Sequence, residues 1–281
     1  MGRRGGACCG DNFGLNYKSP AHFFTSQWPF PPWLYLVYSI IAMIYIPAWL
    51  IAEGVVNFWL HYPGKPATQA KFFIYFTNWS YLVLSLVTIA RGVGVCWYYR
   101  KSQSHGIQDD EVFHGGRMPT VIKIIWVFNN MALGSQVTMA IAFSIYAFGL
   151  GMGSLDREVP LSDPMKIHVH GIGALYILTN MLLSAVPVRI GHFFHVILFV
   201  SVYGIFNLAY ELLGGTNKTG GAGVYSALDW NKQPLSTLLA LVALCAVSIV
   251  WFVLFGLYRL RVFIHEKWFA KKSGYTVIEM D

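Results

Sequence analysis

The sequence predicts an all-α, polytopic membrane protein, in which six transmembrane helices form a bundle and both termini lie in the cytosol. Only 12% of its 281 residues are charged and 56% are hydrophobic, whereas a soluble domain usually carries about 25% charged residues. The chain also holds six apolar runs of about 20 residues, the length that crosses a bilayer core. None of these runs alternates with a period of two, so a helical bundle is favoured over a β-barrel.

The six predicted spans divide the chain into a membrane domain, residues 33–261, and two cytosolic tails, residues 1–32 and 262–281. The spans are residues 33–52, 72–90, 121–148, 171–188, 193–213 and 236–258. Pro47 in the first and Pro187 near the end of the fourth are expected to kink or end their helices. Because residues 1–32 hold no short apolar core before a cleavage site, the first span is expected to act as the insertion signal.

The positions of the basic residues predict the orientation. With the amino terminus in the cytosol, 14 of the 20 Lys and Arg residues fall in inner segments and the other 6 in outer loops, as the positive-inside rule requires. Asn217 begins the glycosylation sequon Asn217-Lys218-Thr219 and falls in an outer loop, which agrees with this orientation. The net charge of +7 is therefore assigned to cytosolic helix ends that meet anionic lipid, and nucleic-acid binding is not expected.

The four cysteines do not form a disulfide framework. Cys8 and Cys9 lie beside basic residues in the cytosolic tail, where disulfides are rare and palmitoylation is plausible. Two unmodified thiols are the equally weighted alternative. The protein is thus expected to be an integral, multi-pass protein of the plasma membrane or an endomembrane, in contact with membrane lipids.

Polar residues recur at a similar depth near the outer ends of four predicted spans. Ionisable and strongly polar groups are expensive in a membrane and often functional. They predict a polar pocket that opens outward or into the outer leaflet. Its candidates are Glu53 and Asn57 at the outer end of the first span, Lys71, Thr77 and Asn78 around the start of the second, His168 and His170 at the outer end of the fourth, and Asn207 and Glu211 near that of the fifth.

Thr77 allows two interpretations. A threonine in a membrane helix usually bonds the carbonyl four residues earlier, here that of Phe73. A hydroxyl beside a base can instead act as a nucleophile, and a histidine exchanges protons near neutral pH. His168 and His170 point about 200° apart on a helix, so only one of them can face such a site.

Metal and cofactor chemistry is not expected. A zinc site needs three or four converging ligands, whereas His168 and His170 lie on the opposite side of the membrane from His192 and His195. A transporter or channel is less favoured, because no inverted repeat or selectivity-filter loop is visible. Buried amides such as Asn129 and Gln136 are assigned mainly to interhelical hydrogen bonds, with a polar path as the alternative.

Three motifs carry a family resemblance: KFFIYFTNW at 71–79, SAVPVRIGH at 184–192 and GVYSALDW at 223–230. They resemble the rolling stone family of multi-pass membrane proteins. That family is similar in turn to the androgen-induced and androgen-dependent membrane hydrolases, six-helix proteins that cleave fatty acid esters of hydroxy fatty acids. The resemblance covers about residues 33–261 and implies the same fold.

The hydrolase resemblance implies a threonine nucleophile and a histidine base. In those hydrolases the threonine follows a lysine and a run of aromatic residues, a pattern that matches Thr77 here. Their histidine lies ten residues before an acidic residue. Counting ten residues on from His170 reaches Asn180, so the resemblance selects His170. In this hypothesis Thr77 attacks a fatty acid ester to give an acyl-enzyme, which water hydrolyses. Side chains such as Asn78, Asn57 or Lys71 stabilise the oxyanion, and Glu211 or Glu53 orients the histidine.

The rolling stone branch is associated with myoblast fusion, which implies a second hypothesis. In it the protein is non-catalytic and acts in fusion, adhesion or signalling, with a protein partner at the outer loops. The glycine-rich segment 214–230 is then a recognition loop rather than a flexible connector. A structure should separate the hypotheses, since catalysis requires Thr77 beside His170 and packing requires Thr77 on the Phe73 carbonyl.

Overall fold

The structure, a computed structural model of the chain, describes residues 12–17, 19–105, 118–145, 167–218, 220, 221, 223–225 and 228–269. Its elements are helical, and within these residues the only β contacts are two isolated bridges. In order they are η2 (Pro20–Phe23), α1 (Pro32–Val55), η3 (Val56–His61), α2 (Pro66–Ala70), η4 (Lys71–Ile74), α3 (Phe76–His105), α5 (Thr120–Ile145), η6 (Ile167–Ile172), α7 (Gly173–Leu183), η7 (Ile190–His192), α8 (Phe193–Leu212) and α9 (Leu235–Trp268).

Among the residues that the structure describes, five helical segments are long and apolar enough to cross a membrane, which confirms the predicted class of all-α membrane protein. They are Pro32–His61, Phe76–Ser104, Thr120–Ile145, Ile190–Leu212 and Leu235–Trp268. A shorter apolar helix, Ile167–Leu183, occupies the place of the predicted fourth span. The count of six membrane crossings and the cytosolic position of both termini stay predictions.

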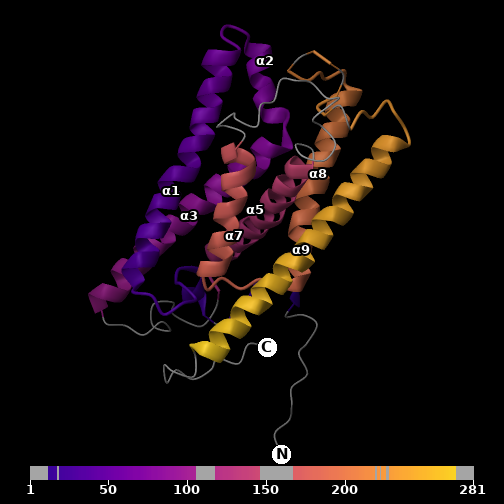
Figure 1. Cartoon of the computed structure of the whole chain (residues 1–281). Helices are drawn as coiled ribbons and strands as arrows, with labels where there is room; N and C mark the ends of the chain where they lie inside the picture. Colours follow the sequence, from indigo (N-terminus) through magenta and orange to yellow (C-terminus); the bar gives the residue numbers. More distant parts are fainter. Residues whose placement is uncertain are drawn as a thin grey trace, which may run out of the picture.

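The helices pack side by side, with α5 in contact with α3, α7, α8 and α9, and α1 lying along α3 (Figure 1). The start of α1 and the end of α9 lie at the same end of the bundle (Figure 1). We call this the tail end. The opposite end holds η3, α2 and residues 213–234, and we call it the loop end.

Residues 19–31, part of the predicted tail, pack against the tail end of the bundle. The side chains of Phe23 and Phe24 are buried. The Gln27 N–H donates to the Leu183 carbonyl at 2.8 Å, and the Ala185 N–H donates to the Thr25 carbonyl at 3.0 Å. This short pairing satisfies backbone groups just beyond the end of α7, where a helix leaves its last carbonyls unpaired.

Gly94 on α3 allows the Phe24 ring to approach. A Cβ atom added at Gly94 would lie 2.2 Å from Phe24 Cε1. We therefore expect Gly94→Ala to displace the ring and to destabilise the protein by about 1–3 kcal/mol, as overpacking does.

Thermal unfolding of the purified protein in detergent checks this expectation. Gly256→Ala on α9 is the matched control, because a Cβ atom there meets nothing within 4 Å. Equal melting temperatures for the two variants would show that Phe24 does not occupy the position described.

The connection between α7 and α8 is extended and buried, unlike the helix predicted for residues 171–188. The helix ends at Leu183. The Arg261 guanidinium donates to the carbonyls of Met181 and Ser184, each at 2.5 Å, and to that of Val186 at 3.3 Å. The Trp126 indole N–H donates to the Pro187 carbonyl at 2.9 Å. Side chains from α9 and α5 thus replace the hydrogen bonds that a longer helix would have made.

Candidate functional site

Thr77 is the second residue of α3. It lies beside Tyr225, a residue of the segment that joins α8 to α9. The Phe76 N–H donates to the Tyr225 phenol oxygen at 2.9 Å, which brings this phenol next to Thr77. Burial raises the pKa of Tyr225, so this phenol stays neutral. The Phe73 carbonyl, which the packing interpretation assigns to Thr77, accepts the Trp79 indole N–H at 2.6 Å.

The two histidines of η6 face different helices, as their spacing predicts. His168 contacts α1, where its Nε2 lies 2.7 Å from the Tyr45 hydroxyl and its ring stacks on Trp49 at 3.5 Å between centroids. His170 contacts α5, where its ring lies parallel to that of Phe143 at 4.2 Å. His170 therefore turns away from α1 and toward α5, where it and Phe143 are half-buried.

Close packing between α3 and α7 sets the level of Thr77 relative to His170. A Cβ atom at Gly173 would lie 3.0 Å from both Tyr81 Cε2 and Gln136 Oε1. Thr77 precedes Tyr81 by four residues, and His170 precedes Gly173 by three. Each lies about one helical turn, about 5 Å, further toward the loop end. The register thus brings Thr77 and His170 to a similar depth on neighbouring helices.

Near Gly173 lie two buried polar atoms that have no hydrogen-bond partner within the described residues. They are the Tyr81 hydroxyl and Gln136 Oε1. Tyr81 is fully buried, and the Glu53 carboxylate is close enough to interact with it electrostatically. Gln136 uses its other polar atom, donating Nε2 to the Ser80 hydroxyl at 3.2 Å. An unpaired buried hydroxyl costs about 1–3 kcal/mol, so it calls for an explanation.

The sequence interpretation missed Tyr81. A tyrosine inside an apolar run usually packs as an aromatic side chain. The one available signal was its position four residues after Thr77, on the same face of the helix. That its hydroxyl has no partner in the described part of the chain follows only from the arrangement of α3, α5 and α7.

Four of the predicted supporting residues meet the segment 213–234, which we call the α8–α9 loop. Lys71 Nζ donates to the Thr216 hydroxyl at 2.6 Å and to the Asn217 carbonyl at 2.9 Å. The remaining contacts are Lys218 Nζ to Asn57 Oδ1 at 2.5 Å, Trp230 Nε1 to Asn207 Oδ1 at 2.7 Å, and the Trp230 N–H to Glu211 Oε1 at 2.8 Å. These four residues lie together around the α8–α9 loop.

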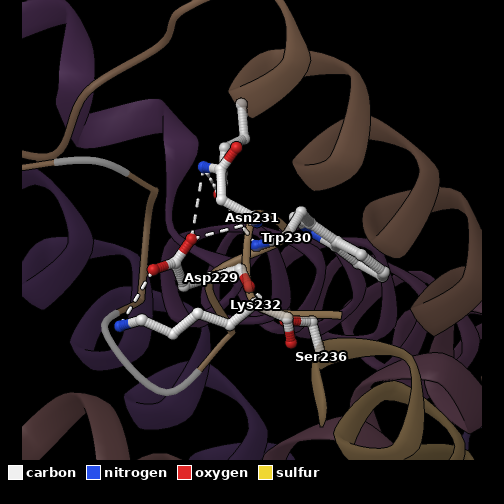
Figure 2. A network of polar contacts seen from close by, with 6 residues as sticks. Asp229, Trp230, Asn231, Lys232 and Ser236 are labelled. Atoms are coloured by element: carbon white, nitrogen blue, oxygen red, sulfur yellow. Dashed lines mark hydrogen bonds and ion pairs between the residues drawn. The ribbon is translucent and has the colours of Figure 1, made fainter. Parts of the chain in front are cut away.

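The carboxyl-terminal part of the α8–α9 loop has its own polar network (Figure 2). The Asp229 carboxylate pairs with Lys232 at 3.0 Å and accepts the Asn231 N–H at 3.1 Å. The Ser236 hydroxyl, at the start of α9, donates to the Asp229 carbonyl. This network fixes the chain where it enters α9.

Asn78 faces a different surface from Thr77. Its Nδ2 donates to the Phe72 carbonyl at 2.7 Å. Its side chain also lines a groove of about 740 Å³ between α1, α3 and α8. Thr77 is not among the lining residues of this groove, so the predicted threonine and amide do not share one surface.

The predicted modification sites are only partly described. Asn217 is half-buried, and its Oδ1 accepts the Gly221 N–H at 2.8 Å. Thr219 of the sequon, Cys8 and Cys9 lie outside the described residues. Within the part of the chain that is described, no group of three His, Cys, Asp or Glu side chains could hold a metal ion.

We expect Glu211→Ala to release the α8–α9 loop. Its buried carboxylate accepts the Trp230 N–H and the Asn231 side-chain amide at 3.1 Å, and truncation leaves these donors without that acceptor. Limited proteolysis should then cut residues 213–234 at least about tenfold faster, because local opening exposes the backbone.

The matched control is Glu266→Ala at the other end of the bundle, which should leave this cleavage rate unchanged. If Glu211→Ala also leaves it unchanged, Glu211 does not hold the loop.

Long apolar helices and a cluster of polar residues at one end define a multi-pass helical membrane protein. The sequence profile of the family described as "Protein rolling stone" matches residues 8–277. The chain belongs to the rolling stone family. It is 27% identical over 254 residues to "Protein rolling stone" of Drosophila melanogaster, a match that covers 89% of this chain and 86% of the relative. No solved structure matches the chain.

Proposed function

We propose that this protein is a membrane-embedded hydrolase of lipid esters, with Thr77 as nucleophile and His170 as base. The observation that carries the proposal is the register between α3 and α7. It supports Thr77 and His170 at one depth, about one helical turn from Tyr81, whose buried hydroxyl has no hydrogen-bond partner within the described residues.

The reaction has two steps. In the first, His170 takes the Thr77 hydroxyl proton while Thr77 Oγ1 attacks the ester carbonyl carbon. The tetrahedral intermediate then breaks its bond to the alcohol oxygen, which receives the proton from His170, and an acyl-threonine remains. In the second step, His170 takes a proton from water, the resulting nucleophile attacks the acyl-threonine, and the acid leaves as Thr77 is reprotonated.

The Tyr81 hydroxyl is the oxyanion donor in this proposal. Lys71 and Asn57, suggested as donors by the sequence, bond with the α8–α9 loop, and Asn78 donates to a backbone carbonyl. Tyr81 is a buried, neutral donor that has no partner within the described residues, and preorganised donors of this kind stabilise a developing negative charge. Glu53, beside Tyr81, is retained as the residue that orients His170.

Covalent labelling with a fluorophosphonate probe tests the proposed hydrolase. Folded wild-type protein should be labelled, and Thr77→Ala and His170→Ala, each shown to be folded by its melting profile, should both lose the label. Equal labelling of wild type and the two variants would contradict the proposal.

The α8–α9 loop supports a second candidate, a non-catalytic protein of cell fusion, adhesion or signalling that binds a protein partner. Hydrogen bonds from α8, η3 and η4 hold this loop at several points, which favours a recognition surface over a flexible connector. The labelling experiment separates the candidates, because a protein without an activated hydroxyl gives only background signal.

A further inference from the structure

We propose that the groove between α1, α3 and α8 binds one acyl chain of an anionic phospholipid, whose phosphate group meets Lys71 and Lys218. This site is separate from the proposed catalytic residues, and it stands whether or not the protein is a hydrolase. Three features carry the inference: the lining of the groove, a glycine that opens it and two ammonium groups above it.

The lining suits a hydrocarbon chain. The groove, of about 740 Å³, is walled by aliphatic and aromatic side chains with Asn78 as a polar exception. This volume falls in the range of about 300–1,000 Å³ that is usual for ligand pockets. Ile51, Phe73 and Leu82 line it and are exposed, so the groove opens sideways. Because its walls belong to apolar helices, the surrounding medium is the lipid chains of the bilayer.

Gly54 on α1 helps to open the groove. It is one of the lining residues, and a Cβ atom added there would meet nothing within 4 Å. Any larger side chain at this position would project into space that is empty in the protein alone. The adjacent acidic residue, Glu53, interacts with Tyr81 and is not among the lining residues of the groove.

Two lysines lie next to Phe72, a residue at the loop end of the groove, although neither lysine lines the groove itself. Lys218 Nζ is 5.7 Å from the ring centroid of Phe72, a lining residue, and 5.3 Å from that of Tyr75. Lys71 directly precedes Phe72, and its ammonium bonds with the neutral Thr216 hydroxyl and Asn217 carbonyl. Neutral partners hold this charge in place without neutralising it.

The positions of the Lys71 and Lys218 ammonium groups favour a lipid with an anionic headgroup. A chain in the groove places its headgroup at the loop end, beside both lysines. Ammonium groups near a membrane surface favour anionic lipids by about fivefold for each lysine, and they form charge-assisted hydrogen bonds to phosphate oxygens. A zwitterionic lipid of the same chain length fits the groove but lacks net negative charge.

Native mass spectrometry of the full chain tests the site. The detergent-purified protein is incubated with equal amounts of phosphatidylserine and phosphatidylcholine that carry identical acyl chains, and retained lipids are counted. Wild type should retain phosphatidylserine at least about fivefold over phosphatidylcholine. Equal retention of the two lipids by wild type would overturn the assignment to an anionic lipid.

Matched glycine variants test the groove. Gly54→Leu should lower the retention of both lipids at least about fivefold, because the new side chain takes the place of the lipid chain. Gly204→Leu on α8 should retain them like wild type, since a Cβ atom there also meets nothing within 4 Å and Gly204 does not line the groove. Ile51→Trp also fills the groove, from an exposed position. It replaces Gly54→Leu as the test variant if Gly54→Leu fails to fold. Retention unchanged in a folded groove variant would overturn the site.

Matched lysine variants test the headgroup contact. The double variant Lys71→Gln with Lys218→Gln should bind both lipids equally. Lys65→Gln, at an exposed lysine of the same end, should keep the wild-type preference. A preference that survives in the double variant would show that other groups select the lipid.

Discussion

Arg261→Met is expected to destabilise the protein by about 3–5 kcal/mol, because each carbonyl that loses a charged donor in a buried site costs about 1–3 kcal/mol. Arg261 is 3% exposed and donates to three backbone carbonyls at the end of α7 and in the following connection. Methionine keeps an unbranched side chain that can fill much of the same space. The main loss is therefore that of hydrogen bonds to the connection between α7 and α8.

The measurement is the free energy of unfolding in mixed micelles, or the melting temperature where unfolding is irreversible. Arg259→Met is the matched control, two residues away on the same helix and exposed. It should change stability by no more than about 0.5 kcal/mol, the usual range for surface substitutions. A loss of similar size in both variants would mean that Arg261 does not have the structural role described.

Tyr81→Phe is expected to lower ester turnover by about 10²–10³-fold while the protein stays folded, the usual cost of removing one oxyanion donor. This prediction rests on the proposed function. The substitution removes only a hydroxyl that has no partner within the described residues, so it should leave stability unchanged or slightly raise it. Substrate affinity should change little, because the oxyanion forms only in the transition state.

Tyr38→Phe is the control for Tyr81→Phe. Tyr38 also carries a buried hydroxyl without a partner in the described part of the chain, but it stacks with Tyr35 and Tyr176, away from Thr77. It should keep wild-type turnover. Turnover unaffected by Tyr81→Phe, in a protein that loses activity with Thr77→Ala, would remove Tyr81 from the mechanism without refuting the nucleophile.

The sequence was sufficient to predict the fold class, because apolar runs of membrane-spanning length leave few alternatives. It could not predict where the fourth helix ends. Leu183 is followed by more apolar residues, and the chain becomes extended there because Arg261 and Trp126, distant in sequence, supply its hydrogen bonds. The same interactions explain why Arg261, one of the basic residues assigned to cytosolic helix ends, is buried.

The sequence indicated a common depth for the candidate polar residues, but it did not indicate their hydrogen-bond partners. Glu211, Asn207, Asn57 and Lys71 do lie together at one end, as their positions near the ends of the spans indicated. Their partners are residues of the α8–α9 loop, and loop contacts leave no periodic signal in a sequence. Tyr81 was missed for a different reason. It is a candidate because its hydroxyl has no hydrogen-bond partner within the described residues, and this can be seen only in the packed structure.

The most direct test of the proposed hydrolase is to locate the probe on the protein. Fluorophosphonate-labelled wild type is digested, and the modified residue is identified by tandem mass spectrometry. We predict a phosphonyl adduct on Thr77, absent from the His170→Ala variant. An adduct on another residue, or none on folded wild-type protein, would contradict Thr77 as the nucleophile.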